Sequence, residues 1–104
     1  MNLSSQIFEK IKSDIHPNWN ESGKIEMTFS GRVDNILFEF DCECSCDISQ
    51  SRDEENNYTQ ETFSNISVEI FYFALVDALK NEVIEDITEI STELTKLIEK
   101  ELEQ

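Results

Sequence analysis

The sequence has few of the residues that form tight turns and catalytic loops. Its 104 residues include two Gly, one Pro and one His. So few Gly exclude the Gly-rich loops that cradle nucleotide phosphates, and a single His excludes the common His-bearing metal motifs. The carboxylates form no distinct motif, because 23 acidic residues supply every spacing by coincidence. We therefore expect a protein that is not an enzyme.

Long apolar segments are also lacking. The apolar run from Ile70 to Val76 is far shorter than the ~20 residues of a membrane-spanning helix. The segment from Met1 to Lys12 is polar and amphipathic, unlike the apolar centre of a signal peptide. Three Cys cannot all pair with one another, which is typical of a reducing compartment. We expect no membrane segment and a cytoplasmic protein.

Basic residues are scarce, and their shortage is uneven along the chain. Eight Lys and Arg stand against 23 Asp and Glu, a net charge of −15. Residues 1–38 contain five acidic and four basic residues, net −1, whereas residues 39–104 contain 18 acidic and four basic ones, net −14. Such a surface repels nucleic acid and anionic lipid. It predicts no direct binding to nucleic acid or membranes and favours a basic protein as the partner.

The hydrophobic pattern begins with a helix and continues with strands. Ile7, Phe8, Ile11 and Ile15 form a helical stripe, with Ser4 or Ser5 as the cap and Pro17 as the end. From Lys24 the period becomes two, which predicts a strand to Ser30, a turn at Asp34-Asn35 and a long strand from Ile36 to Ile48. Residues 49–62 are polar and predict a mobile acidic loop.

The remaining pattern predicts a third strand and a C-terminal helix. The third strand turns Ile66, Val68, Ile70, Tyr72 and Ala74 inward, and we expect the helix to cover its other, apolar face. Residues 76–85 allow either a continuous helix or a hairpin with a short fourth strand. The hairpin is favoured because Asp86 and Glu89 resemble a capping box that starts a helix over Ile87 to Glu103. Residues 1–104 thus predict a single α+β domain: an N-terminal helix, a three- to four-stranded antiparallel meander and a C-terminal amphipathic helix packed on one face.

Cys42, Cys44 and Cys46 are the residues closest to a metal motif. Zinc sites space thiolates as C-x2-C or wider, whereas these alternate along one strand, about 6.6 Å apart for neighbouring pairs. We interpret them as buried apolar side chains and expect no metal ion and no cofactor.

The solvated side of the second strand carries the strongest candidate for a binding site. Glu39, Asp41, Glu43 and Asp47 project from it at ~6.6 Å intervals, a row of charges comparable to the phosphates of a DNA strand. The alternative is a solvated face that only keeps the protein soluble. The surface is expected to extend over further acidic residues and two loop aromatics: Asp53, Glu54, Glu55, Glu82, Glu85, Asp86, Glu89, Glu93, Trp19 and Tyr58.

The last forty residues or so allow a comparison with a known class of proteins. The strand Ile66 to Ile70, the turn around Asn81 and the acidic helix ending at Gln104 resemble small accessory proteins of bacteriophages and mobile elements. That resemblance implies an acidic inhibitor of a nuclease or CRISPR complex that imitates nucleic acid, in the cytoplasm of a bacterial host. It assigns no residue. Alternatives are an immunity protein against a basic toxin and an assembly component, such as a virion accessory protein or a homodimer.

Overall fold

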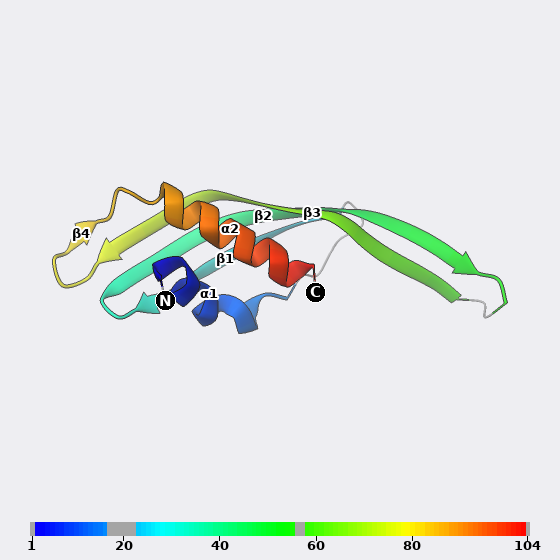
Figure 1. The fold of residues 1–104 in the computed structure, drawn as a ribbon, viewed down its shortest axis with the longest axis horizontal. Coiled ribbons are helices and arrows are strands. Elements are labelled where there is room, and N and C mark those ends of the chain that lie inside the picture. Colours follow the sequence, from blue (N-terminus) through cyan, green and yellow to red (C-terminus); the bar gives the residue numbers. More distant parts are fainter. Residues whose placement is uncertain (1, 17–22, 56–57, 104) are drawn as a thin grey trace.

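The computed structural model describes residues 2–16, 23–55 and 58–103 and has an α+β architecture, as predicted. Four antiparallel strands lie in the order β1-β2-β3-β4, a meander. Figure 1 shows helices at both ends of the chain lying against this sheet. The elements are α1 (Leu3–Ile11), a 3-10 turn (Lys12–Asp14), β1 (Lys24–Val33), β2 (Ile36–Asp53), β3 (Tyr58–Asp77), β4 (Glu82–Val83) and α2 (Thr88–Leu102).

The sheet is much longer than the layer of helices that covers it. The chain extends over 63 × 21 × 17 Å, and β2 and β3 continue well beyond the end of α2 (Figure 1). Because β1 pairs with β2 only as far as Ser45, the described residues beyond that point form a two-stranded ribbon. We call this ribbon, residues 46–55 and 58–65, the arm.

The arm corrects the prediction of a mobile loop over residues 49–62. Ser49–Asp53 pair in register with Tyr58–Thr62, so most of the expected loop is strand. The prediction failed because it looked for apolar alternation, which marks strands with one buried face. A ribbon whose described side chains are mostly exposed needs no such pattern, and its pairing resumes after a register shift between Ser45 and Asp47.

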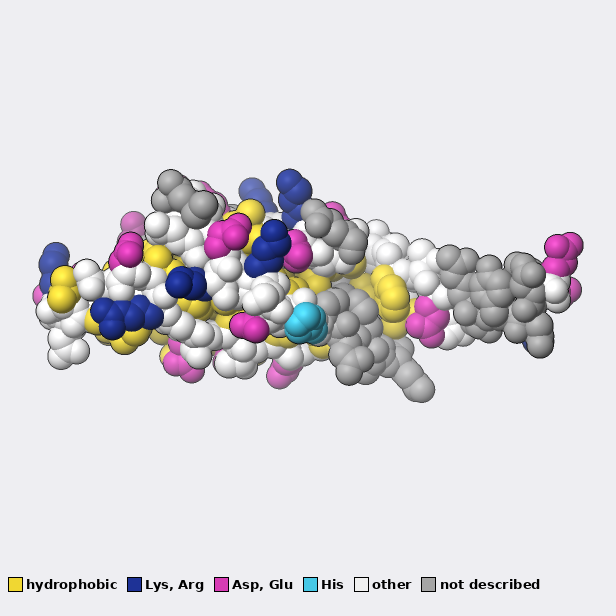
Figure 2. All heavy atoms as spheres, turned by 90° about the horizontal axis from the view of Figure 1, so that it is seen from below, with side chains coloured by type: hydrophobic (Ala, Val, Ile, Leu, Met, Phe, Trp, Pro, Cys, Tyr) yellow, Lys and Arg dark blue, Asp and Glu magenta, His cyan; other side chains and the backbone are white. Residues whose placement is uncertain are grey.

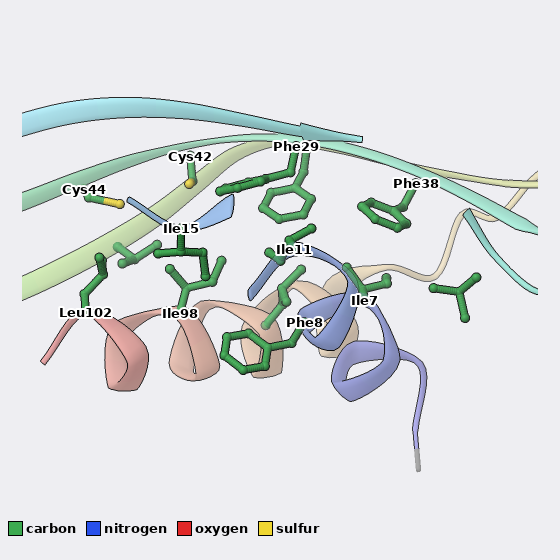
Figure 3. Packing of buried hydrophobic residues seen from close by; sticks show 14 of the residues in the cluster. Ile7, Phe8, Ile11, Ile15, Phe29, Phe38, Cys42, Cys44, Ile98 and Leu102 are labelled. Atoms are coloured by element: carbon green, nitrogen blue, oxygen red, sulfur yellow. The ribbon is translucent and has the colours of Figure 1, made fainter. Parts of the chain in front are cut away.

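Both helices lie on one face of the sheet, and the core fills the space between the helices and the sheet. Figure 3 shows Ile7 of α1 and Ile98 and Leu102 of α2 directed at the sheet, and the Phe8 ring of α1 beside α2. In α2 the buried residues Leu94, Ile98 and Leu102 recur every four positions, the spacing of one helical face. The predicted C-terminal helix packed on one face is therefore confirmed.

An aromatic cluster forms the centre of this core. The Phe40 side chain is fully buried, and its ring centroid lies 5.2 Å from Phe29, 5.6 Å from Phe73 and 6.4 Å from Phe38. These residues face the helices because β1, β2 and β3 turn alternate side chains to the same side. Ring contacts at such distances stabilise a fold beyond the apolar area that they bury.

The third strand is placed as predicted, but part of its inward face differs. Its pairing with β2 shifts between Ile70 and Tyr72, so Phe71 is an extra residue, a β-bulge. Beyond the bulge the faces exchange: Phe73 and Leu75 pack on the core, and Tyr72 is 47% exposed. The prediction of inward Tyr72 and Ala74, with a helix over the opposite side, was wrong because uninterrupted alternation cannot reveal a bulge.

The chain between β3 and α2 is a hairpin, as the sequence favoured. Asp77 Oδ1 accepts hydrogen bonds from the backbone of Leu79 and Lys80 (3.0 and 3.2 Å), and Asn81 has φ of 54°. Asn and Asp supply such turns because they tolerate positive φ.

The helix starts differ slightly from the expected caps. Asn2 caps α1 by accepting from the Ser5 backbone N–H, and Ser4 is buried instead. The helix α2 begins after Ile87 without a side-chain cap, so Asp86 does not cap it. The helices of the described residues are too short and too polar to cross a membrane.

Candidate binding surface

The face of the sheet turned away from the helices contains the predicted row of carboxylates. We call it the open face: the outward side chains of β1, β2 and β3, which no described element covers. Glu39, Asp41 and Glu43 follow one another along β2 at alternate positions, about 6.6 Å apart. Glu39 is exposed, and Asp41 and Glu43 are half-buried among their neighbours. The structure thus places these three predicted residues together.

A second line of carboxylates crosses the first at Glu43. The register sets Glu26 of β1 and Glu69 of β3 directly opposite Glu43, so three strands present a carboxylate in one transverse row. Directly opposite side chains have Cβ atoms about 4.5–5.5 Å apart, and like charges so placed are destabilising. The sequence analysis did not select Glu26 and Glu69. Their strands were predicted, but only the pairing register shows that they meet.

The other end of the open face presents exposed apolar side chains beside Arg32. Leu37, Val76 and Val83 lie opposite one another across β2, β3 and β4. Leu37 is 43% and Val83 68% exposed, and Tyr72 and Phe71 nearby on β3 are 47% and 56% exposed. Exposed apolar side chains that cluster in this way mark interaction surfaces more often than scattered ones do.

The arm carries the next group of predicted residues. Asp47 continues the β2 row, and its Oδ2 accepts a hydrogen bond from Asn65 Nδ2 at 2.7 Å. Glu54 and Glu55 lie at the exposed far turn, several residues beyond the acidic rows. The backbones of Asp53 and Tyr58 pair with each other there. The predicted loop acids are therefore held on a β-ribbon.

The acidic residues before and within α2 lie elsewhere. Glu82 belongs to β4, Glu85 and Asp86 to the connection that follows, and Glu89 to the first turn of α2. All four are exposed, but this connection leads to the helical side of the sheet. They do not continue the rows on the open face. Trp19 lies outside the described residues.

Two carboxylates of α2 have structural partners. The Glu93 carboxylate accepts hydrogen bonds from the Ser4 hydroxyl and from Asn2 Nδ2, which ties α2 to the start of α1. Glu99 Oε1 accepts from the backbone N–H of Val68 at 3.0 Å. These contacts hold the helix layer together, and they place Glu93 between the two helices, away from the carboxylate rows of the open face.

The cysteines lie on the covered side of the sheet. Cys42 and Cys44 are fully buried and Cys46 is half-buried, as the alternating pattern predicted. A hydrogen bond to Cys42, together with burial, raises the pKa of Cys44, and burial raises the pKa of Cys46. Within residues 2–16, 23–55 and 58–103, no three His, Cys, Asp or Glu side chains converge on a possible metal position.

The basic residues lie on both helices, at the β1–β2 and β3–β4 turns, at the start of β1 and in the arm. Figure 2 shows Lys and Arg side chains mixed with acidic ones over the helix-bearing half. On the open face, the Arg32 guanidinium is held at the β1–β2 turn, where Nε donates to the Asp34 backbone oxygen at 2.6 Å. Arg32 therefore lies away from the carboxylate rows near Glu43, whereas Lys24 at the start of β1 lies one alternate position beyond Glu26 and lines a shallow pocket with Glu26 and Glu43.

Comparisons with protein families, with curated proteins and with solved structures find nothing that matches this chain.

Proposed function

We propose that this chain is a non-enzymatic inhibitor that occupies the nucleic-acid-binding groove of a basic protein through its open face. The target class is a nuclease or a CRISPR-type complex in a bacterial host, as the resemblance to phage and mobile-element accessory proteins implies. A basic toxin would be bound by the same interactions, which would make the chain an immunity protein.

The observation that carries the proposal is the crossing of two carboxylate rows at Glu43. Glu39, Asp41 and Glu43 run along β2, while Glu26 and Glu69 flank Glu43 on the adjoining strands. Together they form a rigid, two-dimensional set of negative charges on a sheet. Lys and Arg side chains that bind phosphates also bind carboxylates through charged hydrogen bonds. A groove lined with such side chains therefore suits this face.

The energetic cost of the transverse row supports a role in binding. Like charges placed opposite one another on adjacent strands each cost about 0.2–1 kcal/mol. Solubility alone needs no such arrangement, because a small domain is soluble with a net charge of about 2–8, and this chain has −15. A bound cationic partner would relieve the repulsion, so that relief adds to the affinity.

The test is competition with nucleic acid. The protein is immobilised, bacterial lysate is passed over it at low and at high salt, and the captured basic protein is then mixed with labelled DNA or RNA. We expect this chain to displace the nucleic acid, with an affinity that falls steeply as salt rises, because salt screens exposed charges.

Two triple variants with the same change of charge test the location. Glu39→Lys, Asp41→Lys and Glu43→Lys together should abolish displacement. The control combines Glu9→Lys, Asp14→Lys and Glu103→Lys, three exposed positions outside the open face, and should retain most of the activity. Equal loss in both variants, or binding that salt does not weaken, would refute the proposal.

The open edge of β3 favours a second candidate, an assembly component. Within the described chain, β4 covers the outer edge of β3 only at Val76 and Asp77. Unpaired strand edges add strands from other molecules. Size exclusion distinguishes the two candidates: a species well above 12.1 kDa favours assembly, and a monomer at high concentration excludes a homo-oligomer.

A further inference from the structure

The open face contains a depression between its exposed apolar side chains and its acidic rows. Its volume is 320 Å³, and its lining includes Ser30, Leu37, Glu39, Ala74 and Val76. The depression exists because Ser30, Glu39 and Ala74 form one cross-strand row in which two of the three side chains are small. Larger side chains stand on both sides: Arg32, Leu37 and Val76 in one flanking row, Tyr72 in the other.

We propose that this face binds a basic amphipathic helix of the partner, which inserts an apolar side chain into the depression and sets Lys or Arg over the carboxylate rows. This inference rests on the proposed function and adds the form of the bound segment. It names an apolar anchor as well as the charges.

Spacing supports a helix lying along β2. The row of Glu39 and the row of Glu43 are four residues apart, about 13 Å along a strand. A helix rises about 12 Å over eight residues. An apolar residue at position i above the depression therefore places position i+4 near Asp41 and positions i+7 and i+8 near Glu43. These positions share one helical face.

The architecture supports the same occupant. A sheet of this kind is stable with helices on one or on both of its faces. Here α1 and α2 cover one face, whereas Leu37 and Tyr72 remain 43% and 47% exposed on the other. A helix from the partner would complete a third layer and bury those side chains.

Charge decides between possible occupants of this face. A second copy of this chain would bring two molecules of net charge −15 together, with both sets of carboxylate rows close to the contact. Nucleic acid and anionic lipid would be repelled for the same reason. A helix with positive charge at i+4, i+7 and i+8 is complementary to Asp41, Glu43 and the flanking Glu26 and Glu69.

The experiment uses a synthetic peptide of about 20 residues, long enough to span both rows as a helix. It carries leucine at position i and lysine at i+4, i+7 and i+8, with a fluorescent label, and its scrambled version is the control. Fluorescence anisotropy with the full-length protein at low salt should show saturable binding of the designed peptide. The scrambled peptide should bind at least about tenfold more weakly, a difference that anisotropy resolves readily.

Uncharged substitutions test the depression separately from the acidic rows. Ala74→Gln fills the depression without changing the charge and should weaken binding of the designed peptide about tenfold. Ala78→Gln, at an exposed position in the β3–β4 turn, should have no effect. If Ala74→Gln does not fold, as judged by circular dichroism, Leu37→Ser replaces it, with Leu79→Ser in the exposed turn as its control.

Charge substitutions then separate this inference from the proposed function. Glu43→Lys should weaken binding, and Glu103→Lys should not. If Glu43→Lys acts and the depression variants do not, the helix site is refuted while an acidic binding face stands. If Glu43→Lys has no effect, the proposed function fails too. Equal binding of the scrambled peptide, absence of saturable binding, or a dimer that Ala74→Gln dissociates would each overturn the inference.

Discussion

The two faces of the sheet are formed by the same three strands but differ in what the chain places on them. The covered face holds Phe29, Phe40 and two buried thiols under α1 and α2. The open face presents crossing rows of carboxylates and a group of exposed apolar side chains. The covered face accounts for the stability of the fold. The open face carries charges that oppose folding, which is the compromise expected of a binding surface.

The largest difference in stability is expected between two variants that each replace one aromatic residue by alanine, one on the covered face and one on the open face. Phe40→Ala leaves a cavity in the centre of the core and should lower the free energy of unfolding by about 3–5 kcal/mol. Phe71→Ala removes a ring that is 56% exposed and should cost less than about 1 kcal/mol. Urea unfolding followed by circular dichroism measures both. Similar losses of stability in the two variants would mean that the Phe71 ring is packed against other residues in solution.

The next effect concerns the edge of β3 where α2 meets it. Glu99→Ala removes the carboxylate that accepts from Val68 N–H and should cost about 1.5–3 kcal/mol, as for other hydrogen bonds to charged groups. Glu103→Ala, at the exposed end of the same helix, is the control and should be almost neutral. Thermal unfolding of the two variants provides the measurement, and equal stability would show that the contact contributes nothing.

The buried thiols should make the covered face sensitive to alkaline pH. A hydrogen bond to Cys42 and burial raise the pKa of Cys44 in the folded protein, so the folded state retains a proton that the unfolded state loses above about pH 8.5. The stabilisation is complete below that pH, and the free energy of unfolding should fall by up to about 1.4 kcal/mol per pH unit above it. Because the same hydrogen bond lowers the pKa of Cys42, and Cys42 would stay buried without it, the double variant Cys42→Ala and Cys44→Ala should show a shallower decline in urea unfolding. Parallel pH curves would contradict the assignment.

Removing charge from the open face should stabilise the free protein. Glu43→Gln relieves the repulsion from Glu26 and Glu69 and should raise the free energy of unfolding by about 0.2–1 kcal/mol for each neighbour. Glu103→Gln is the matched control. Added salt should produce part of the same gain in the wild type, because it screens the carboxylates. A loss of stability in Glu43→Gln would show that the carboxylate is held by favourable contacts.

The smallest effect is expected where both faces of the sheet are open. Replacing residues 49–62 by an Asn-Gly turn joins the cross-strand pair Ile48 and Phe63 through a two-residue hairpin. Since the core cluster contains no residue of the arm, the free energy of unfolding should change by less than about 0.5 kcal/mol. A larger loss would mean that the arm supports the body of the sheet.

The parts of the fold that could be predicted were the elements with one buried face. Burial of one face places apolar residues at regular intervals in the sequence, and that interval can be recognised. Alternating residues predicted β1 and most of β2, and the helix expected over Ile87 to Glu103 agrees with α2 (Thr88–Leu102). The arm lacked that interval because its described side chains are mostly exposed. The bulge at Phe71 was not predictable either. A locally alternating sequence does not show where one strand has an extra residue that lacks a counterpart on the paired strand.

The candidate site divides in a similar way. Alternation along β2 was sufficient to place Glu39, Asp41 and Glu43 on one side of a strand. Their meeting with Glu26 and Glu69 depends on the register of three strands. The separation of Glu85 and Glu89 from this surface depends on which face of the sheet α2 covers. The sequence did not decide between the two faces, and the prediction placed the helix on the wrong one.

The sequence by itself determined the period of β1, of β2 as far as Ile48 and of α2, and hence their type, their buried side and the charge along their solvated side. The reason is local: side chains two apart on a strand, or three and four apart on a helix, share a face whatever lies around them. Tertiary structure alone decided that both helices cover the same face, that carboxylates from three strands form one row and that small side chains leave a depression beside them. Those features depend on contacts between residues far apart in the chain, which no local period encodes.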